Sequence, residues 1–146
     1  MAKVVVLMGS EKDREFAEPA LKLLRNMGVE YEVYQASAHK QPERVLEIVR
    51  KYEREEGIVF LTIAGRSNAL SGMVDAQTRH PVVSCPHLEG EFAPFDLFSS
   101  LRMPSWVAPL VVLGPENAVL AALKILALKD PSLTEKVEKL QRHRIK

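Results

Sequence analysis

The stretch Lys3-Val4-Val5-Val6-Leu7-Met8, followed at once by Gly9-Ser10, decides the fold class of this chain. An uninterrupted apolar run of this length is typical of a strand that is buried on both faces of a parallel sheet. Residues 13–27 then place apolar side chains at helical spacing, and Gly28 is a natural place for a helix to end. A buried strand that leads directly into an amphipathic helix predicts the start of a β-α-β arrangement.

The same alternation continues to the end of the chain. Further strands are expected at residues 31–36, 58–64, 82–85 and 107–113, with Pro86 closing the fourth. Further helices are expected after Pro42, at residues 69–78 and 115–128, and from Asp130-Pro131 onward. Five such strands predict an α/β chain with a flavodoxin-like three-layer α/β/α sandwich around a parallel sheet. Residues 86–104 form the only long irregular connection that we expect.

Composition limits the classes of protein. The 146 residues fit a single α/β domain, 1–146. The net charge of +1 provides no strong field for nucleic acid or an anionic membrane. The only cysteine, Cys85, excludes an intrachain disulfide and a multi-cysteine metal site, and it suits a core position better than a nucleophile. No apolar run is long enough to span a membrane, so we expect a cytoplasmic protein. No metal or cofactor is expected.

Small and polar residues follow the first strand, and we expect them at the ligand-binding edge of the sheet. In open α/β sheets, ligands bind at the carboxyl ends of the strands. Gly9 permits close backbone approach, Ser10 supplies a hydroxyl, and the following helix begins with free N–H groups that suit phosphate. Asp13 is positioned to cap that helix or to accept hydrogen bonds from ribose hydroxyls. A purely structural strand–turn–helix connection remains an alternative for this loop.

The second and third strand ends add cationic and hydroxyl groups. Ser37 and Lys40 are candidate anion ligands, and His39 between them is the best acid/base candidate because imidazole titrates near neutrality. Gly65 and Ser67 follow the third strand and could approach a ligand through the backbone. A solvated loop histidine and an ordinary polar turn are the alternatives.

The helix expected at residues 115–128 is unusual because Lys124 is the only polar residue between Ala118 and Leu128. A helix that is apolar on all sides is buried on more than one side. Subunit contact in an oligomer is the favoured interpretation, with Leu123 and Leu126 at the contact. A core helix of the single chain is the alternative.

Four motifs along the chain resemble the aminoimidazole ribonucleotide carboxylases and mutases of purine synthesis. They occur in the family's order over nearly the whole chain: Met8-Gly9-Ser10-Glu11-Lys12-Asp13, Ser37-Ala38-His39-Lys40, Ala64-Gly65-Arg66-Ser67-Asn68-Ala69-Leu70-Ser71-Gly72 and Ser99-Ser100-Leu101-Arg102-Met103-Pro104-Ser105. Lys40 and the third motif look like the branch that uses CO2 directly, whereas the mutase branch usually has arginine and a histidine-containing third loop. Lys12 and Trp106 depart from the family's usual serine and glycine.

The resemblance implies the reversible carboxylation of 5-aminoimidazole ribonucleotide with CO2, without metal or biotin. It implies that His39 moves the proton at the reacting carbon and that the ribose phosphate and the base are held by separate loops. The residues implied as substrate ligands are Ser10, Asp13, Ser37 and Lys40 for the ribose phosphate and Gly65 and Ser67 for the base or carboxylate. It also implies a homo-octamer. The alternatives are the N5-carboxyaminoimidazole ribonucleotide mutase and a non-catalytic nucleotide-sensing module.

Overall fold

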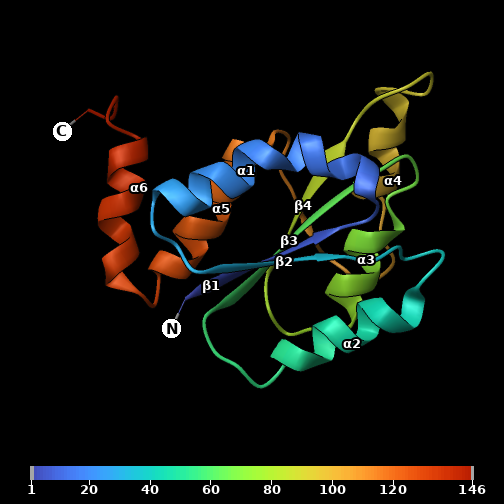
Figure 1. Cartoon of the computed structure of the whole chain (residues 1–146), viewed down its shortest axis with the longest axis horizontal. Coiled ribbons are helices and arrows are strands. Elements are labelled where there is room, and N and C mark those ends of the chain that lie inside the picture. Colours follow the sequence, from blue (N-terminus) through green and yellow to red (C-terminus); the bar gives the residue numbers. More distant parts are fainter. Residues whose placement is uncertain (1, 146) are drawn as a thin grey trace.

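The computed structural model describes residues 2–145 and contains one parallel sheet of five strands in the order β2-β1-β3-β4-β5. Every neighbouring pair is parallel. This is the flavodoxin-like strand order, so the predicted fold is confirmed (Figure 1). The strands are β1 (Lys3–Met8), β2 (Tyr31–Gln35), β3 (Ile58–Gly65), β4 (Val82–His87) and β5 (Leu110–Val111).

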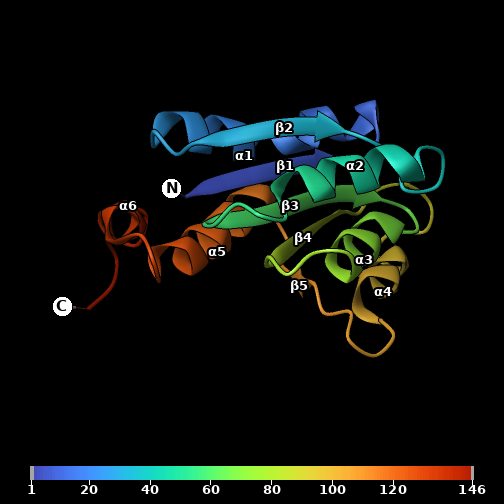
Figure 2. The same cartoon turned by 90° about the horizontal axis from the view of Figure 1, so that it is seen from below.

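Helices cover both faces of the sheet. Figure 2 shows α2 and α3 on the near side of the sheet and α1 on the far side. The helices are α1 (Arg14–Asn26), α2 (Pro42–Tyr52), α3 (Ala69–Ala76), α4 (Phe98–Leu101), α5 (Pro115–Ala127) and α6 (Thr134–Leu140). Short 3-10 turns precede three of them: η1 (Glu11–Asp13), η2 (Phe95–Leu97) and η3 (Pro131–Leu133).

Alternate residues of β1 pack on opposite faces of the sheet. Val4, Val6 and Met8 belong to the cluster that contains the buried residues of α1 and α5. Val5 and Leu7 belong to the cluster that contains those of α2 and α3. All five side chains are completely buried, as expected of a parallel strand with helices on both sides. The continuous apolar run is therefore explained by two cores rather than one.

Most of the apolar surface of α5 is buried against other elements of the same chain. Leu123 is fully buried and Leu126 is 5% exposed, both in the cluster with α1 and β1. The expectation that these two leucines lie at a subunit contact was therefore wrong. The sheet covers one side of α5 and α1 covers another, so a helix of a small domain is buried broadly without a second subunit. Leu128, one residue past the helix, is 84% exposed.

Most predicted boundaries agree with the structure to within two residues, and the larger differences lie between β4 and β5. β4 continues through Pro86 to His87, because β5 pairs only as far as Ser84 and leaves that part of β4 an edge where proline is tolerated. β5 is only two residues long, and Pro109 directly before it has no N–H for the sheet. The 86–104 connection is not irregular throughout, since it contains η2 and α4.

Two further expectations from composition can be compared with the structure. Cys85 is completely buried in the core, and burial raises the pKa of its thiol to about 12, which does not suit a nucleophile. Among residues 2–145, no helix is long and apolar enough to cross a membrane.

Because Leu123 belongs to the monomer's core, we expect Leu123→Ala to lower the free energy of unfolding by about 2–5 kcal/mol. Leu128→Ala is the matched control, and its effect should stay within about 0.5 kcal/mol because the side chain is already exposed. Denaturant unfolding followed by circular dichroism measures both values. Equal effects of the two substitutions would contradict the assignment of Leu123 to this core.

Candidate active site

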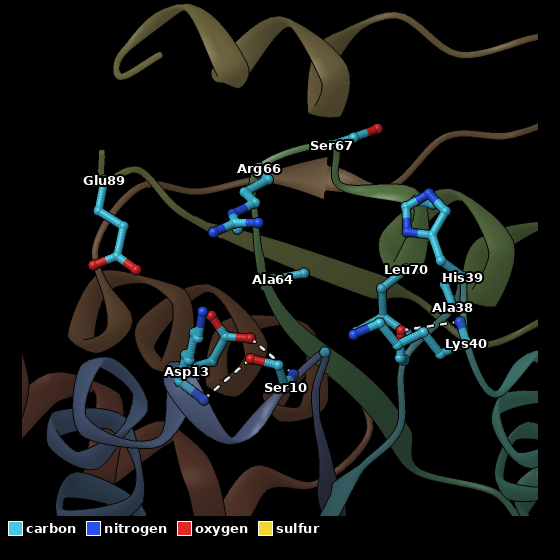
Figure 3. A pocket seen from close by; sticks show the side chains of 15 residues that line it. Ser10, Asp13, Ala38, His39, Lys40, Ala64, Arg66, Ser67, Leu70 and Glu89 are labelled. Atoms are coloured by element: carbon cyan, nitrogen blue, oxygen red, sulfur yellow. Dashed lines mark hydrogen bonds between the residues drawn. The ribbon is translucent and has the colours of Figure 1, made fainter. Parts of the chain in front are cut away.

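A cavity of about 380 Å³ opens at the carboxyl edge of the sheet, where the loops after β1, β2 and β3 meet. Every site residue proposed from the sequence lines it. In Figure 3, Ser10 and Asp13 lie on one side of the space, and His39 and Lys40 lie on the other. Its polar and charged lining residues are Ser10, Lys12, Asp13, Ser37, His39, Lys40, Arg66, Ser67 and Glu89.

The loop after β1 is fixed by a capping box. The Ser10 hydroxyl accepts a hydrogen bond from the Lys12 N–H at 3.0 Å, and Asp13 Oδ2 accepts one from the Ser10 N–H at 3.0 Å. Asp13 is 4% exposed although it lines the cavity. Asp13 makes no side-chain hydrogen bond to the start of α1, so the expected cap of that helix is not observed; it instead completes the capping box of η1, whose N-cap is Ser10. The Ser10 hydroxyl keeps its own proton to donate to a ligand.

The loop after β2 is a tight turn that presents two exposed side chains. The Ser37 hydroxyl accepts a hydrogen bond from the Lys40 N–H at 3.1 Å, which holds the turn closed. The side chains of His39 and Lys40 are exposed and line the cavity. The imidazole and the ammonium group are thus both accessible to a ligand.

The loop after β3 approaches its neighbours closely. A Cβ on Gly65 would lie 3.0 Å from the His87 carbonyl oxygen, so glycine is required by the close packing of two strand ends. Arg66 has a φ of 56°, the left-handed region that is uncommon for residues other than glycine. The Ser99 hydroxyl lies 3.2 Å from the Arg66 carbonyl and accepts from the Asn68 N–H at 2.9 Å. This contact supports the strained turn from outside the loop.

Asn68 ties the same loop to the rest of the fold. Its buried side-chain amide donates to the Ser84 hydroxyl at 3.1 Å and to the Ser100 hydroxyl at 2.9 Å, and its oxygen accepts from the Ser71 N–H at 3.3 Å. The loop after β3 is therefore held by β4, by α4 and by the first turn of α3. Sequence reasoning did not assign this role to Asn68.

The fourth strand end contributes a residue that sequence reasoning missed. His87 Nδ1 lies 3.0 Å from Asp13 Oδ1, and its Nε2 lies 3.3 Å from Glu89 Oε2. The His87 ring stacks on Phe16 at a centroid distance of 4.2 Å. The usable signal was the position of His87 at a strand end on the same edge as the other three loops.

The charges of the cavity suit a ligand with an anionic group and hydroxyl groups. Lys12, Lys40 and Arg66 provide three cations, and Asp13 and Glu89 provide two carboxylates. Serine hydroxyls and the backbone of two glycine-containing turns lie between them. Among the described residues, His39 is the only histidine in the lining.

The family described as AIR carboxylase matches residues 3–146. The chain belongs to this family. It is 49% identical over 142 residues to the phosphoribosylaminoimidazole carboxylase of Archaeoglobus fulgidus, covering 97% of this chain and 78% of the relative. It is 41% identical over 138 residues to the N5-carboxyaminoimidazole ribonucleotide mutase of Methanocaldococcus jannaschii, covering 92% of this chain and 85% of that relative.

A solved structure agrees with the family assignment. The crystal structure of Treponema denticola PurE matches with a TM-score of 0.92 at 40% identity, covering 98% of this chain and 91% of that one. The chain is therefore an AIR carboxylase family enzyme of purine biosynthesis. Its relatives include both carboxylases and a mutase, so family membership leaves the two reactions open.

Proposed function

We propose that the chain carboxylates 5-aminoimidazole ribonucleotide directly with CO2, in a reversible reaction that gives 4-carboxy-5-aminoimidazole ribonucleotide. The observation that carries this proposal is the third loop, Gly65-Arg66-Ser67-Asn68, which lines the cavity with Arg66 and Ser67 and contains no histidine. The mutase branch usually has a histidine in the corresponding loop. Lys40 in place of arginine supports the same branch.

We assign the ribose phosphate to the space between the first two loops. The Ser10 and Ser37 hydroxyls and the Lys40 ammonium group are the donors that a phosphate needs, and all three line the same space. Asp13 is an acceptor, so it suits the ribose hydroxyls better than the phosphate. Together, the first two loops therefore supply donors for the anionic part of the ligand and an acceptor for its neutral part.

The reaction needs one group that takes and returns a proton. The aminoimidazole ring is electron-rich, so its C4 attacks the carbon of CO2 and a new carbon–carbon bond forms. C4 then carries both hydrogen and carboxylate, and loss of its proton restores the aromatic ring. His39 takes that proton, and returns it in the reverse decarboxylation. Holding the nucleotide and CO2 in one cavity makes the encounter effectively intramolecular.

We assign the base and the new carboxylate to the third loop. Gly65 and Ser67 allow close approach, and the Arg66 guanidinium is suited to pair with a carboxylate through two parallel hydrogen bonds. The turn that contains Arg66 is linked to Ser99 by the hydrogen bond from the Asn68 N–H to the Ser99 hydroxyl. We therefore assign carboxylate recognition to this loop.

Incubation with aminoimidazole ribonucleotide and bicarbonate, without ATP, tests the proposed reaction. We expect formation of the 4-carboxylated product, followed by its ultraviolet absorbance or by incorporation of labelled carbonate. Turnover of the N5-carboxylated isomer alone would assign the chain to the mutases instead. Binding without any turnover would indicate a nucleotide sensor.

His39→Asn should remove at least about nine-tenths of the turnover, because proton transfer by a positioned group typically contributes about 10²–10⁴-fold. Nucleotide binding and thermal stability should remain close to those of the unchanged protein, since His39 is exposed and outside the core. His143→Asn, at another exposed histidine, is the control. Activity above about a tenth in the His39 variant would remove His39 from the acid/base role.

Lys40→Ala should raise KM for the nucleotide about tenfold or more and change kcat less. A hydrogen bond to a charged group contributes about 1.5–3 kcal/mol, and a phosphate contact stabilises the ground and transition states alike. Lys22→Ala, at an exposed lysine of α1, should leave both constants unchanged. Calorimetry that finds the same nucleotide affinity in the Lys40 variant would place this side chain outside the phosphate site.

We further propose that the chain assembles as a homo-oligomer larger than a dimer, with an octamer as the expected state. Several large apolar side chains of one segment are exposed: Phe92, Phe95, Phe98, Leu101 and Trp106. Trp106, the most exposed of them at 97%, departs from the glycine common in the family. Exposed apolar patches commonly mark subunit contacts, and this segment replaces α5 as the expected contact.

Light scattering at micromolar concentration should therefore give a mass several times that of one chain. Trp106→Lys should reduce that mass without lowering the stability of the separated chain, because the tryptophan contributes nothing to the core. A monomer mass for the unchanged protein would contradict the proposed assembly.

A further inference from the structure

His87 brings a hydrogen-bond donor to the one carboxylate of the cavity that is almost entirely buried. Its Nδ1 lies 3.0 Å from Asp13 Oδ1, within hydrogen-bond distance. The two residues are 74 positions apart in sequence and meet because β4 ends beside β3 and the loop after β1. His87 does not itself line the cavity, so it reaches a ligand only through Asp13.

The ring is fixed on three sides. Phe16 stacks parallel to it, with 7° between the ring planes. Glu89 Oε2 lies 3.3 Å from Nε2, so each ring nitrogen faces a carboxylate oxygen. Only 12% of the His87 side chain is exposed, which leaves the ring little freedom to turn away from Asp13.

Ser10 and His87 together fix the orientation of both carboxylate oxygens of Asp13. Oδ2 accepts from the Ser10 N–H at 3.0 Å, and Oδ1 faces His87. A Cβ on Gly9 would lie 3.6 Å from Oδ2, and one on Gly65 would lie 3.9 Å from Oδ1, so the carboxylate is enclosed between two strand ends. Each oxygen retains an unused acceptor position, and the orientation of those positions is set by the two donors.

We propose that His87 is a positioning residue for nucleotide binding: it orients the Asp13 carboxylate toward the ribose hydroxyls. The inference rests on the proposed function, since it uses a ribose phosphate ligand. His87 takes no part in the proton transfer at C4, which belongs to His39. Loss of His87 therefore weakens the binding of the nucleotide in the ground state and in the transition state alike, so the effect appears as a higher KM.

The test uses two variants of similar size in the full-length protein, His87→Asn and His87→Leu. The asparagine amide can donate from nearly the position of Nδ1, whereas leucine cannot donate at all. Phe16→Leu is the control that removes the stacked ring and leaves the donor. His87→Ala is a second variant without a donor, in case leucine does not fit, and thermal unfolding checks that each protein is folded.

The probe is aminoimidazole ribonucleotide, measured by calorimetry and by steady-state kinetics with CO2. His87→Leu and His87→Ala should raise Kd and KM about tenfold and change kcat less than about threefold, the size expected for one hydrogen bond to a charged group. His87→Asn and Phe16→Leu should stay within about threefold of the unchanged protein in all three constants.

Three results would overturn the inference while leaving the proposed function intact. The first is normal nucleotide binding by a folded His87→Leu or His87→Ala variant. The second is a His87→Asn variant that binds the nucleotide as weakly as those two. The third is an effect of the His87 substitutions on kcat alone. If the unchanged protein neither binds nor converts the nucleotide, the proposed function fails and this inference fails with it.

Discussion

Burial of the parallel sheet on both faces is the constraint on which the rest of this structure depends. Parallel neighbours require every connection to return across the sheet, and here helices make most of those returns. The helices remove water from both faces, which explains why β1 is apolar at every position from Val4 to Met8. Polar loops follow the carboxyl ends of β1, β2 and β3, and these ends meet at one edge of the sheet.

At that edge the Asp13 carboxylate has a central place. It completes the capping box of the first loop and contacts His87 at the end of β4. Such a buried charge needs donors, and here a backbone N–H and an imidazole provide them. The glycines that flank it, Gly9 and Gly65, leave the room that a carboxylate between two strand ends requires. The geometry of the cavity therefore depends on residues from four separate parts of the chain.

The sequence was sufficient to predict the fold and the three loops that line the cavity. It was less informative about contacts between segments that are distant along the chain. β1 was predicted with its exact bounds, because its pattern is local. The burial of Leu123 was misjudged, because an apolar helix looks the same whether the sheet or another chain covers it. His87 was not singled out from the sequence, since nothing near it along the chain indicates its contact with Asp13. Arg66 was quoted within a motif, but its left-handed backbone has no sequence signal.

The hydrogen bonds around Asn68 have a consequence for how this enzyme can change. Ser84 and Ser100 are buried, and both accept from the Asn68 amide, while the Ser99 hydroxyl contacts the Arg66 carbonyl and the Asn68 N–H on either side of Ser67. A third loop transplanted from a relative without this asparagine would leave buried hydroxyls without their donor, which carries a cost in stability. The sequences of this loop and of the segment that contains α4 are therefore expected to change together in evolution rather than separately.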